Sequence, residues 1–130
     1  MSCNVLIVDD STILRTAIRK VIRLAGIEDD RIHEAANGQD ALAVLDTVWI
    51  DVVLLDLNMP VMDGEEFVRR LREKPELGDV AVVIVSTESN KVRLQRLRDL
   101  GVTDTLHKPF EPEDLRRLVD RIVGVRKEAQ

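Results

Sequence analysis

Residues 80–85 have the sequence Val-Ala-Val-Val-Ile-Val, the longest uninterrupted apolar run in the chain. Two shorter runs, Val5–Val8 and Val52–Leu55, are also rich in branched aliphatic residues, and none of the three alternates between apolar and polar positions. Alternation is typical of a strand with one face in water, whereas a continuous apolar run is typical of a strand buried on both faces. The three runs therefore predict a parallel sheet that is covered by helices on both sides.

Five segments between and after these runs have the apolar spacing of one helix face. Ser11 is suited to the N-cap of the first helix and Gly26 to its end, and Pro112 with Glu113 suits the first turn of the last helix. The apolar positions are Leu14, Ala17, Ile18, Val21, Ile22 and Ala25; Ala41, Leu42 and Leu45; Phe67, Val68 and Leu71; Leu94, Leu97 and Leu100; and Leu115, Leu118, Val119, Ile122 and Val123.

Two weaker strands are expected at residues 31–36 and 102–107, where the polarity is mixed. Edge strands are less hydrophobic than central ones, so these two should flank the sheet. The tally of five strand–helix units predicts an α/β chain with a doubly wound (βα)5 fold, a three-layer sandwich with parallel strand order 2-1-3-4-5. In such sheets ligands bind beyond the carboxyl ends of the strands, where the strand order reverses.

Length and composition narrow the class of protein. A chain of 130 residues is about one domain, so residues 1–130 should form a single domain, with 126–130 as a frayed tail. Apolar runs of at most six residues are far short of the roughly 20 needed to cross a bilayer. The start of the chain shows no secretory leader, and Cys3 is the only cysteine, which together favour the cytoplasm.

The charge pattern argues against nucleic acid as a direct ligand. The net charge is −5, with 10 Lys and Arg against 7 Asp and Glu in residues 91–130, and 9 against 17 in residues 1–90. The basic cluster Lys91, Arg93, Arg96 and Arg98 is too short for a phosphate-binding stripe. We expect it to form a solvated helix face.

Chemically active side chains follow four of the predicted strands. Asp9 and Asp10 follow the first, Asp56 the third, Ser86 the fourth and Lys108 the fifth. Neighbouring parallel strands lie about 4.8 Å apart, so three carboxylates should crowd together at one edge of the sheet. A hard cation would relieve their repulsion, and oxygen ligands at this density suit Mg²⁺.

Mg²⁺ is commonly shared with phosphate oxygens, so the cluster suggests a site for a phosphoryl group. Asp56 would be the nucleophile, because a carboxylate can accept a phosphoryl group as an acyl phosphate. Lys108 would place an ammonium charge on a phosphoryl oxygen, and the Ser86 hydroxyl would donate to another. A lone Asp after a strand is usually a turn or cap residue, but here four strand ends agree.

These residues resemble the receiver domain of response regulators in two-component signalling. The likeness rests on Asp9 and Asp10, on Asp-Leu-Asn-Met-Pro-Val-Met-Asp-Gly at residues 56–64, on Ser86 and on Lys108-Pro109-Phe110, and it covers nearly the whole chain. The length resembles that of stand-alone chemotaxis-type regulators. The resemblance implies a flavodoxin-like fold, the same strand order that the apolar pattern predicts.

The resemblance also implies roles for individual residues. Asp56 would be the phosphoacceptor, with Asp10, Asp56 and the backbone carbonyl of Asn58 as direct metal ligands and Asp9 acting largely through water. The cofactor would be Mg²⁺, with Mn²⁺ as a substitute. A histidine kinase or phosphotransfer protein would supply the phosphoryl group from a phosphohistidine, and the chain would catalyse only its own phosphorylation and dephosphorylation. Met59, Pro60 and Gly64 would shape the loop after the third strand.

Two positions are implied to tune loss of the phosphoryl group: Asn58, two residues after the acceptor, and Glu88, two residues after Ser86. Their identities resemble those of fast-decaying chemotaxis regulators, which predicts a short-lived aspartyl phosphate. The family usually has Tyr or Phe three residues before the lysine as half of a switch with the Ser or Thr hydroxyl. Thr105 occupies that position here, so Ser86 keeps its switch role without an aromatic partner. His107 could compensate, or could be an ordinary surface histidine.

The output surface implied by the resemblance is the face of the fourth helix, the fifth strand and the fifth helix, where a downstream protein would dock. Val92 lies away from the apolar face of the fourth helix and is expected to be exposed there, as a docking patch or as a scattered surface valine. Trp49 precedes Asp56 by seven residues, or ~23 Å of extended strand. It should lie at the opposite end of the sheet.

Three alternatives stay open. A phosphatase of the haloacid dehalogenase type also uses an Asp nucleophile, Mg²⁺ and Lys, but it should carry Asp-x-Asp after the first strand. A nucleotide-binding protein should carry Gly-x-x-x-x-Gly-Lys or Gly-x-Gly-x-x-Gly, and neither occurs. An interaction scaffold with an inactive pocket should lack one of the expected residues, and none is missing.

Overall fold

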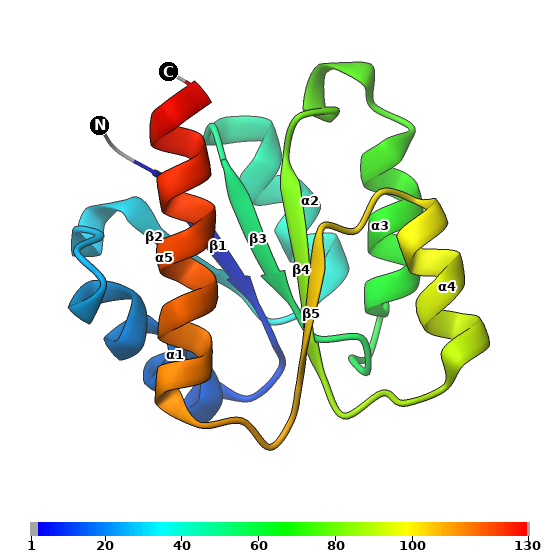
Figure 1. The fold of residues 1–130 in the computed structure, drawn as a ribbon. Helices are drawn as coiled ribbons and strands as arrows, with labels where there is room; N and C mark the ends of the chain where they lie inside the picture. Colours follow the sequence, from blue (N-terminus) through cyan, green and yellow to red (C-terminus); the bar gives the residue numbers. More distant parts are fainter. Residues whose placement is uncertain (1–2, 130) are drawn as a thin grey trace.

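The computed structural model describes residues 3–129 as a five-stranded parallel sheet with helices on both faces (Figure 1). The strands are β1 (Val5–Val8), β2 (Ile32–Ala35), β3 (Val52–Leu55), β4 (Ala81–Ser86) and β5 (Asp104–His107). The helices are α1 (Thr12–Leu24), α2 (Gly38–Thr47), α3 (Gly64–Arg72), α4 (Lys91–Asp99) and α5 (Pro112–Ala129), with short 3₁₀ turns η1 (Asp29–Arg31) and η2 (Pro75–Leu77). The predicted α/β class and the alternation of strands and helices are confirmed.

The strand order is β2-β1-β3-β4-β5, as the polarity of the strands predicts. The register places Val8 of β1 beside Leu55 of β3, so the residues that follow these two strands leave the sheet side by side. The order reverses between β1 and β3, because β2 lies on the outer side of β1. The acidic residues that follow β1 and β3 therefore lie at the reversal point, where doubly wound sheets bind their ligands.

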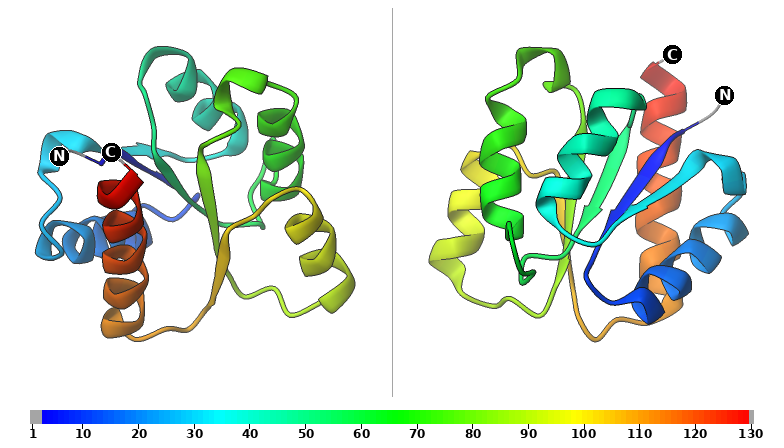
Figure 2. Two further views of the ribbon diagram at one scale, coloured as in Figure 1. Left: turned by 45° about the horizontal axis from the view of Figure 1, so that its top comes forward. Right: turned by 180° about the vertical axis from the view of Figure 1, so that it is seen from behind.

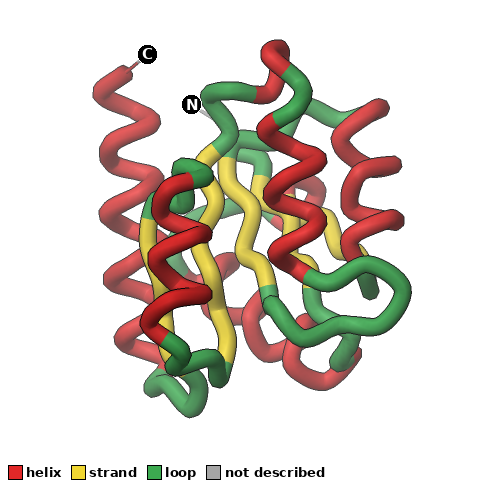
Figure 3. The backbone as a smooth tube through the Cα atoms, turned by 90° about the vertical axis from the view of Figure 1, so that its right-hand side faces the viewer, coloured by secondary structure: helices red, strands yellow, loops and turns green. Residues whose placement is uncertain are grey.

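Two apolar clusters fill the space between the sheet and the two helical layers. Alternate residues of the central strands enter each cluster: Leu6 and Val53 pack with α2, α3 and α4, whereas Ile7 and Leu54 pack with α1 and α5. The right-hand view of Figure 2 shows the molecule from the side opposite to Figure 1, and Figure 3 shows the strands between the two helical layers. Both faces of β1 and β3 are buried, which explains their unbroken apolar sequences.

The edge strands are more exposed than the central ones, as expected. Residues of β5 alternate between half-buried and exposed, and the two middle residues of β2 are half-buried. Both strands are shorter than the predicted segments 31–36 and 102–107. At the end of the chain α5 continues through Ala129, and Gln130 lies outside the described residues. Among the residues of these elements, no helix has the length and apolar character that a membrane crossing requires.

Residues at its two ends set where helix α1, which follows Asp9 and Asp10, begins and ends. The Ser11 hydroxyl accepts a hydrogen bond from the backbone N–H of Leu14 at 3.1 Å, which caps α1. After Leu24 the chain turns through Gly26, whose φ of +99° is a conformation that glycine adopts without steric cost. Both boundary predictions are confirmed.

Candidate functional site

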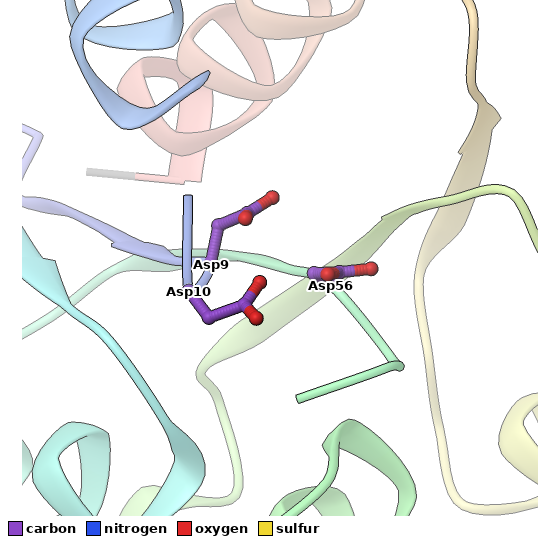
Figure 4. A group of neighbouring side chains, drawn as sticks. All are labelled: Asp9, Asp10 and Asp56. Carbon is purple, nitrogen blue, oxygen red and sulfur yellow. The ribbon is translucent and has the colours of Figure 1, made fainter. Parts of the chain in front are cut away.

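Three carboxylates meet at the carboxyl edge of the sheet. One oxygen from each of Asp9, Asp10 and Asp56 lies within 4.8 Å of the others, and Figure 4 shows the three side chains beside one another. The backbone N–H of Asp56 donates to the carbonyl of Val8 at 2.9 Å, which extends the pairing of β1 and β3 into the site. The side chains of Asp9 and Asp56 are buried, and Asp10 is exposed. The sequence predicted this meeting of carboxylates.

Lys108 reaches the carboxylates from the end of β5. Its Nζ lies 2.9 Å from Oδ2 of Asp9 and 3.7 Å from Oδ1 of Asp56. The backbone N–H of Lys108 donates to the carbonyl of Ser86 at 2.8 Å, which fixes the end of β5 against β4. The side chain is therefore placed to contact an anion held beside Asp56, although its nearer partner in this structure is Asp9.

The surroundings of Asp56 favour the neutral form of its carboxyl group. Burial raises the pKa of Asp56, the positive charge of Lys108 opposes that rise, and the negative charges of Asp9 and Asp10 add to it. The single ammonium group of Lys108 does not balance three carboxylates. A divalent cation would supply the missing positive charge, and all three candidate ligands are hard oxygen donors.

The contacts of Asp9 indicate which carboxylates fit such a cation. Oδ1 of Asp9 accepts from the backbone N–H of Ser11 at 2.8 Å, and Oδ2 accepts from Lys108 at 2.9 Å. Both oxygens are already hydrogen-bonded, whereas the exposed Asp10 faces the same space as Asp56. The oxygens of all three acids lie close enough to share one cation, and those of Asp9 are already engaged by Ser11 and Lys108.

The loop after β3 passes close to the backbone of Asp56. A Cβ atom on Gly64 would lie 2.6 Å from the carbonyl oxygen of Asp56, which is shorter than real contacts allow. The backbone N–H of Gly64 donates to the carbonyl of Leu57 at 2.9 Å, and Asp63 caps α3 by accepting from the N–H of Glu66. The resemblance implied that Gly64 shapes this loop, and the backbone of Asp56 and Leu57 occupies the space that a side chain at Gly64 would need.

Ser86 is buried at the end of β4, and its Oγ accepts a hydrogen bond from the backbone N–H of Glu88 at 3.2 Å. Thr105 is exposed on β5 and pairs with Ile84, so it lies on the face of the sheet that packs with α4. His107 is also exposed, and its Nε2 lies 3.1 Å from the carbonyl oxygen of Thr87 in the loop after β4. It therefore contacts the loop that follows Ser86.

One residue beside the site was assigned wrongly from the sequence. Arg93 was expected on a solvated helix face, but only 20% of its side chain is exposed and its guanidinium contacts Asn58, Glu88 and Glu65. Arg96, at 49% exposure, also pairs with Glu65. Asn58 lies 35 positions before Arg93 in the chain, and no local pattern indicates the pairing.

Arg15 of α1 contacts the acidic pair, and this residue was not identified from the sequence. Nη1 of Arg15 donates to the backbone carbonyl of Asp9, while its Nε donates to Glu34 of β2 at 2.9 Å. The first turn of α1 is therefore tied to the end of β1. The sequence neighbours of Arg15, which are Leu14 and Thr16, did not indicate this contact.

Comparison with known proteins places this chain in a family. The chain matches the family model of the response regulator receiver domain over residues 5–120. It is 34% identical over 121 residues to the two-component response regulator ORR3 of Oryza sativa subsp. indica, covering 92% of this chain and 90% of that protein. It is 32% identical over 130 residues to the cyclic di-GMP phosphodiesterase response regulator RpfG of Xanthomonas campestris pv. campestris, covering all of this chain but 34% of that protein.

Solved structures agree with this match. The chemotaxis response regulator CheY4 of Vibrio cholerae superposes with a TM-score of 0.84 at 34% identity, over 94% of this chain and 99% of that one. The REC domain of AraT from Geobacillus stearothermophilus gives a TM-score of 0.83 at 31% identity, with both chains fully covered. The chain belongs to the response regulator receiver domain family, whose members are signalling switches of two-component systems.

Proposed function

We propose that Asp56 accepts a phosphoryl group from the phosphohistidine of a histidine kinase or phosphotransfer protein, in a reaction that the chain itself catalyses. The observation that carries this proposal is the buried carboxylate of Asp56 between Lys108 and two further acids, with one oxygen of each acid within 4.8 Å of the others. Two buried acids with a third acid beside them are costly to the fold, so a functional role explains the cluster better than a structural one.

In the proposed reaction, a carboxylate oxygen of Asp56 attacks the phosphorus in line with the phosphorus–nitrogen bond. The new bond is an acyl phosphate, and the electron pair of the broken bond goes to the imidazole of the donor. Lys108 moves its charge from Asp9 toward a phosphoryl oxygen, for which its present position 3.7 Å from Oδ1 of Asp56 is suited. The Ser86 hydroxyl donates to a second phosphoryl oxygen.

A bound Mg²⁺, or Mn²⁺ as a substitute, would neutralise phosphoryl charge during transfer. Asp10, Asp56 and the backbone carbonyl of Asn58 would hold the ion directly, and Asp9 would act through water. The two hydrogen bonds that already occupy Asp9 support this division of roles. Metal binding requires the ionised carboxylate, and the raised pKa of Asp56 shifts its ionisation, and with it ion binding, to higher pH than for an ordinary aspartate.

The signal would leave the site through Ser86 and Thr105 and alter the face formed by α4, β5 and α5, where a downstream protein docks. Val92 on α4 is 67% exposed, as expected of a residue on that surface. With Asn58 and Glu88 beside the site, the aspartyl phosphate is lost by hydrolysis within a short time. We further propose that residues 1–130 form one receiver domain of a cytoplasmic, chemotaxis-type regulator that acts on protein and not directly on nucleic acid.

The test is incubation with acetyl phosphate and Mg²⁺, read by acid-quenched intact mass. We expect a gain of one phosphoryl group that requires Mg²⁺ and is abolished in Asp56→Asn. Asp46→Asn is the matched control, because Asp46 is an acid of α2 that pairs with Lys74 rather than with the site. No gain of mass in the native protein would support the inactive-scaffold alternative, and a half-life of hours would contradict rapid decay.

The phosphatase alternative has a distinct outcome. An Asp-nucleophile phosphatase would release free phosphate catalytically from varied small phosphomonoesters, whereas the proposed switch turns over only its own acyl phosphate. The adjacent pair Asp9 and Asp10 after β1, in place of Asp-x-Asp, favours the switch.

A further inference from the structure

We propose that Arg93 is a positioning residue that holds the side chains of Asn58 and Glu88 together and thereby sets the lifetime of the aspartyl phosphate. This inference rests on the proposed phosphorylation of Asp56. It assigns a role to a side chain of α4 that lies outside the acidic cluster and would not itself contact the phosphoryl group.

A single nitrogen of Arg93 joins the two loops that border the site. Nη1 donates to Oε1 of Glu88 at 2.5 Å and to Oδ1 of Asn58 at 3.3 Å. Each partner is also connected to a site residue through its own backbone. The N–H of Asn58 points to Oδ1 of Asp56 at 3.5 Å, and the N–H of Glu88 donates to Oγ of Ser86 at 3.2 Å. Arg93 therefore links the acceptor side of the site to the hydroxyl side.

Further contacts fix the guanidinium of Arg93 itself. Its Nε donates to Oε1 of Glu65 at 3.1 Å, and its Nη2 lies 3.8 Å from Oδ2 of Asp63. Glu65 is held in turn by Arg69 and Arg96, and only 12% of its side chain is exposed. The first turn of α4 is thus anchored to the first turn of α3, and the two helices lie side by side in Figures 1 and 2. The planar fork of arginine suits such a multiple contact, which a lysine could not reproduce.

The interaction of Arg93 with the carboxylate of Glu88 supports the positioning role of Arg93. The hydrogen bond from Arg93 lowers the pKa of Glu88, together with the backbone N–H of Asn90, so this carboxylate stays ionised and in place. Hydrolysis of an acyl phosphate requires a water molecule to be held in line with the bond that breaks. Side chains that are fixed near the phosphoryl group hold such a water more of the time than mobile ones. Release of Asn58 and Glu88 should therefore slow hydrolysis.

A double-mutant cycle on the full chain tests this role. After phosphorylation with acetyl phosphate and Mg²⁺, the donor is removed and the decay constant is measured by rapid quench and intact mass for the native protein, Arg93→Gln, Glu88→Gln and the double variant. We expect Arg93→Gln to slow decay by roughly threefold or more. We also expect Glu88→Gln to have a much smaller effect in the Arg93→Gln background than in the native one, because Arg93 acts through Glu88.

Arg96→Gln is the matched control, since Arg96 lies on the same helix and pairs with Glu65 without a contact to Asn58 or Glu88 in the described contacts. Its decay constant should stay within about twofold of the native value. A second readout needs no phosphorylation: in the carboxylate NMR titration of the native fold, the pKa of Glu88 should rise in Arg93→Gln and not in Arg96→Gln. Loss of stability alone would not produce either result.

The outcomes separate the two proposals. A phosphorylated Arg93→Gln protein that decays at the native rate or faster, or fold-changes that simply multiply in the double variant, would overturn the inference and leave the proposed function intact. A native protein that takes up no phosphoryl group would overturn the proposed function and this inference together.

Discussion

At the scale of single residues, Asp56 combines burial with two negative neighbours, and this combination costs folding free energy. Only 8% of the residue is exposed, and its pKa is raised first by burial and further by Asp9 and Asp10, against the opposing charge of Lys108. A raised carboxyl pKa in the folded state means that the charged form destabilises the fold above that pKa. The penalty fades as the pH falls through the pKa of Asp56.

Asp56→Asn should therefore stabilise the metal-free protein. We expect the free energy of unfolding at pH 7 to rise by about 1 kcal/mol, because one charge is removed from three crowded carboxylates. The measurement is urea denaturation in the presence of EDTA, repeated toward acidic pH, where the gain should disappear. Asp10→Asn is the control, and it should give a smaller gain because Asp10 is exposed. A less stable Asp56→Asn protein would contradict this account.

Val61 is strained in the loop that carries Met59 and Pro60. Its φ of 72° lies in the left-handed region, which a β-branched residue rarely adopts, and 76% of the residue is exposed. Val61→Asn should raise the free energy of unfolding by about 1 kcal/mol, because Asn tolerates this conformation. Val92→Asn is a matched control, since Val92 is exposed in a helix where Val and Asn have similar propensities. Equal changes in the free energy of unfolding for the two variants would show that Val61 is not strained.

At the scale of elements, Glu65 joins α3 to α4. Three arginines converge on its carboxylate, and the hydrogen bond from Arg96 is the main cause that lowers the pKa of Glu65 to about 2. A lowered carboxyl pKa contributes stability that is present above the unfolded value near 4.5 and is lost as the pH falls toward about 2. The two helices are thus held together by a pH-dependent contact.

Glu65→Gln should lower the free energy of unfolding at pH 7 by about 1–2 kcal/mol, a figure that allows for solvent screening of the exposed arginine partners. Urea denaturation between pH 7 and pH 2 should show the variant and the native protein converging at the acidic end. Glu66→Gln provides the comparison: Glu66 forms a surface pair with Arg70 at 3.4 Å, with about half of each side chain exposed. Its loss should cost at most about 0.5 kcal/mol.

Element boundaries were largely predictable because they depend on local chemistry. The Ser11 cap, the Gly26 turn and the start of α5 at Pro112 follow from the conformations that these residues adopt within a few positions of the chain. The contacts between elements were not predictable in the same way. Arg93 and Arg96 have the same side chain on one helix, yet only Arg93 contacts Asn58 and Glu88, because the rotation of α4 against α3 decides which arginine turns inward.

At the scale of the whole molecule, the single tryptophan lies far from the site. The side chain of Asn4, just before β1, donates to the carbonyl of Trp49 at 2.7 Å, so Trp49 lies at the amino edge of the sheet and Asp56 at the carboxyl edge. The predicted location is confirmed.

Phosphorylation should therefore change the emission of Trp49 by only a few per cent. Fluorescence spectra before and after addition of acetyl phosphate and Mg²⁺ measure this, with phosphorylation checked by mass. A Thr105→Trp, Trp49→Phe variant serves as the positive control, because Thr105 lies on the proposed switch face beside α4. A large change at Trp49 would show that the signal crosses the sheet to its amino edge.

The α/β class, the strand order and the meeting of Asp9, Asp10, Asp56 and Lys108 could all be inferred from the order of residues in the chain. Unbroken apolar runs require burial on both faces, and parallel strands then bring the residues that follow them to one edge. Two further features depend on the packing of the folded chain: Lys108 contacts Asp9 more closely than Asp56, and Arg93 contacts both Asn58 and Glu88. Such contacts depend on how loops and helices from distant parts of the chain pack within an ångström or so, and no local periodicity records that packing.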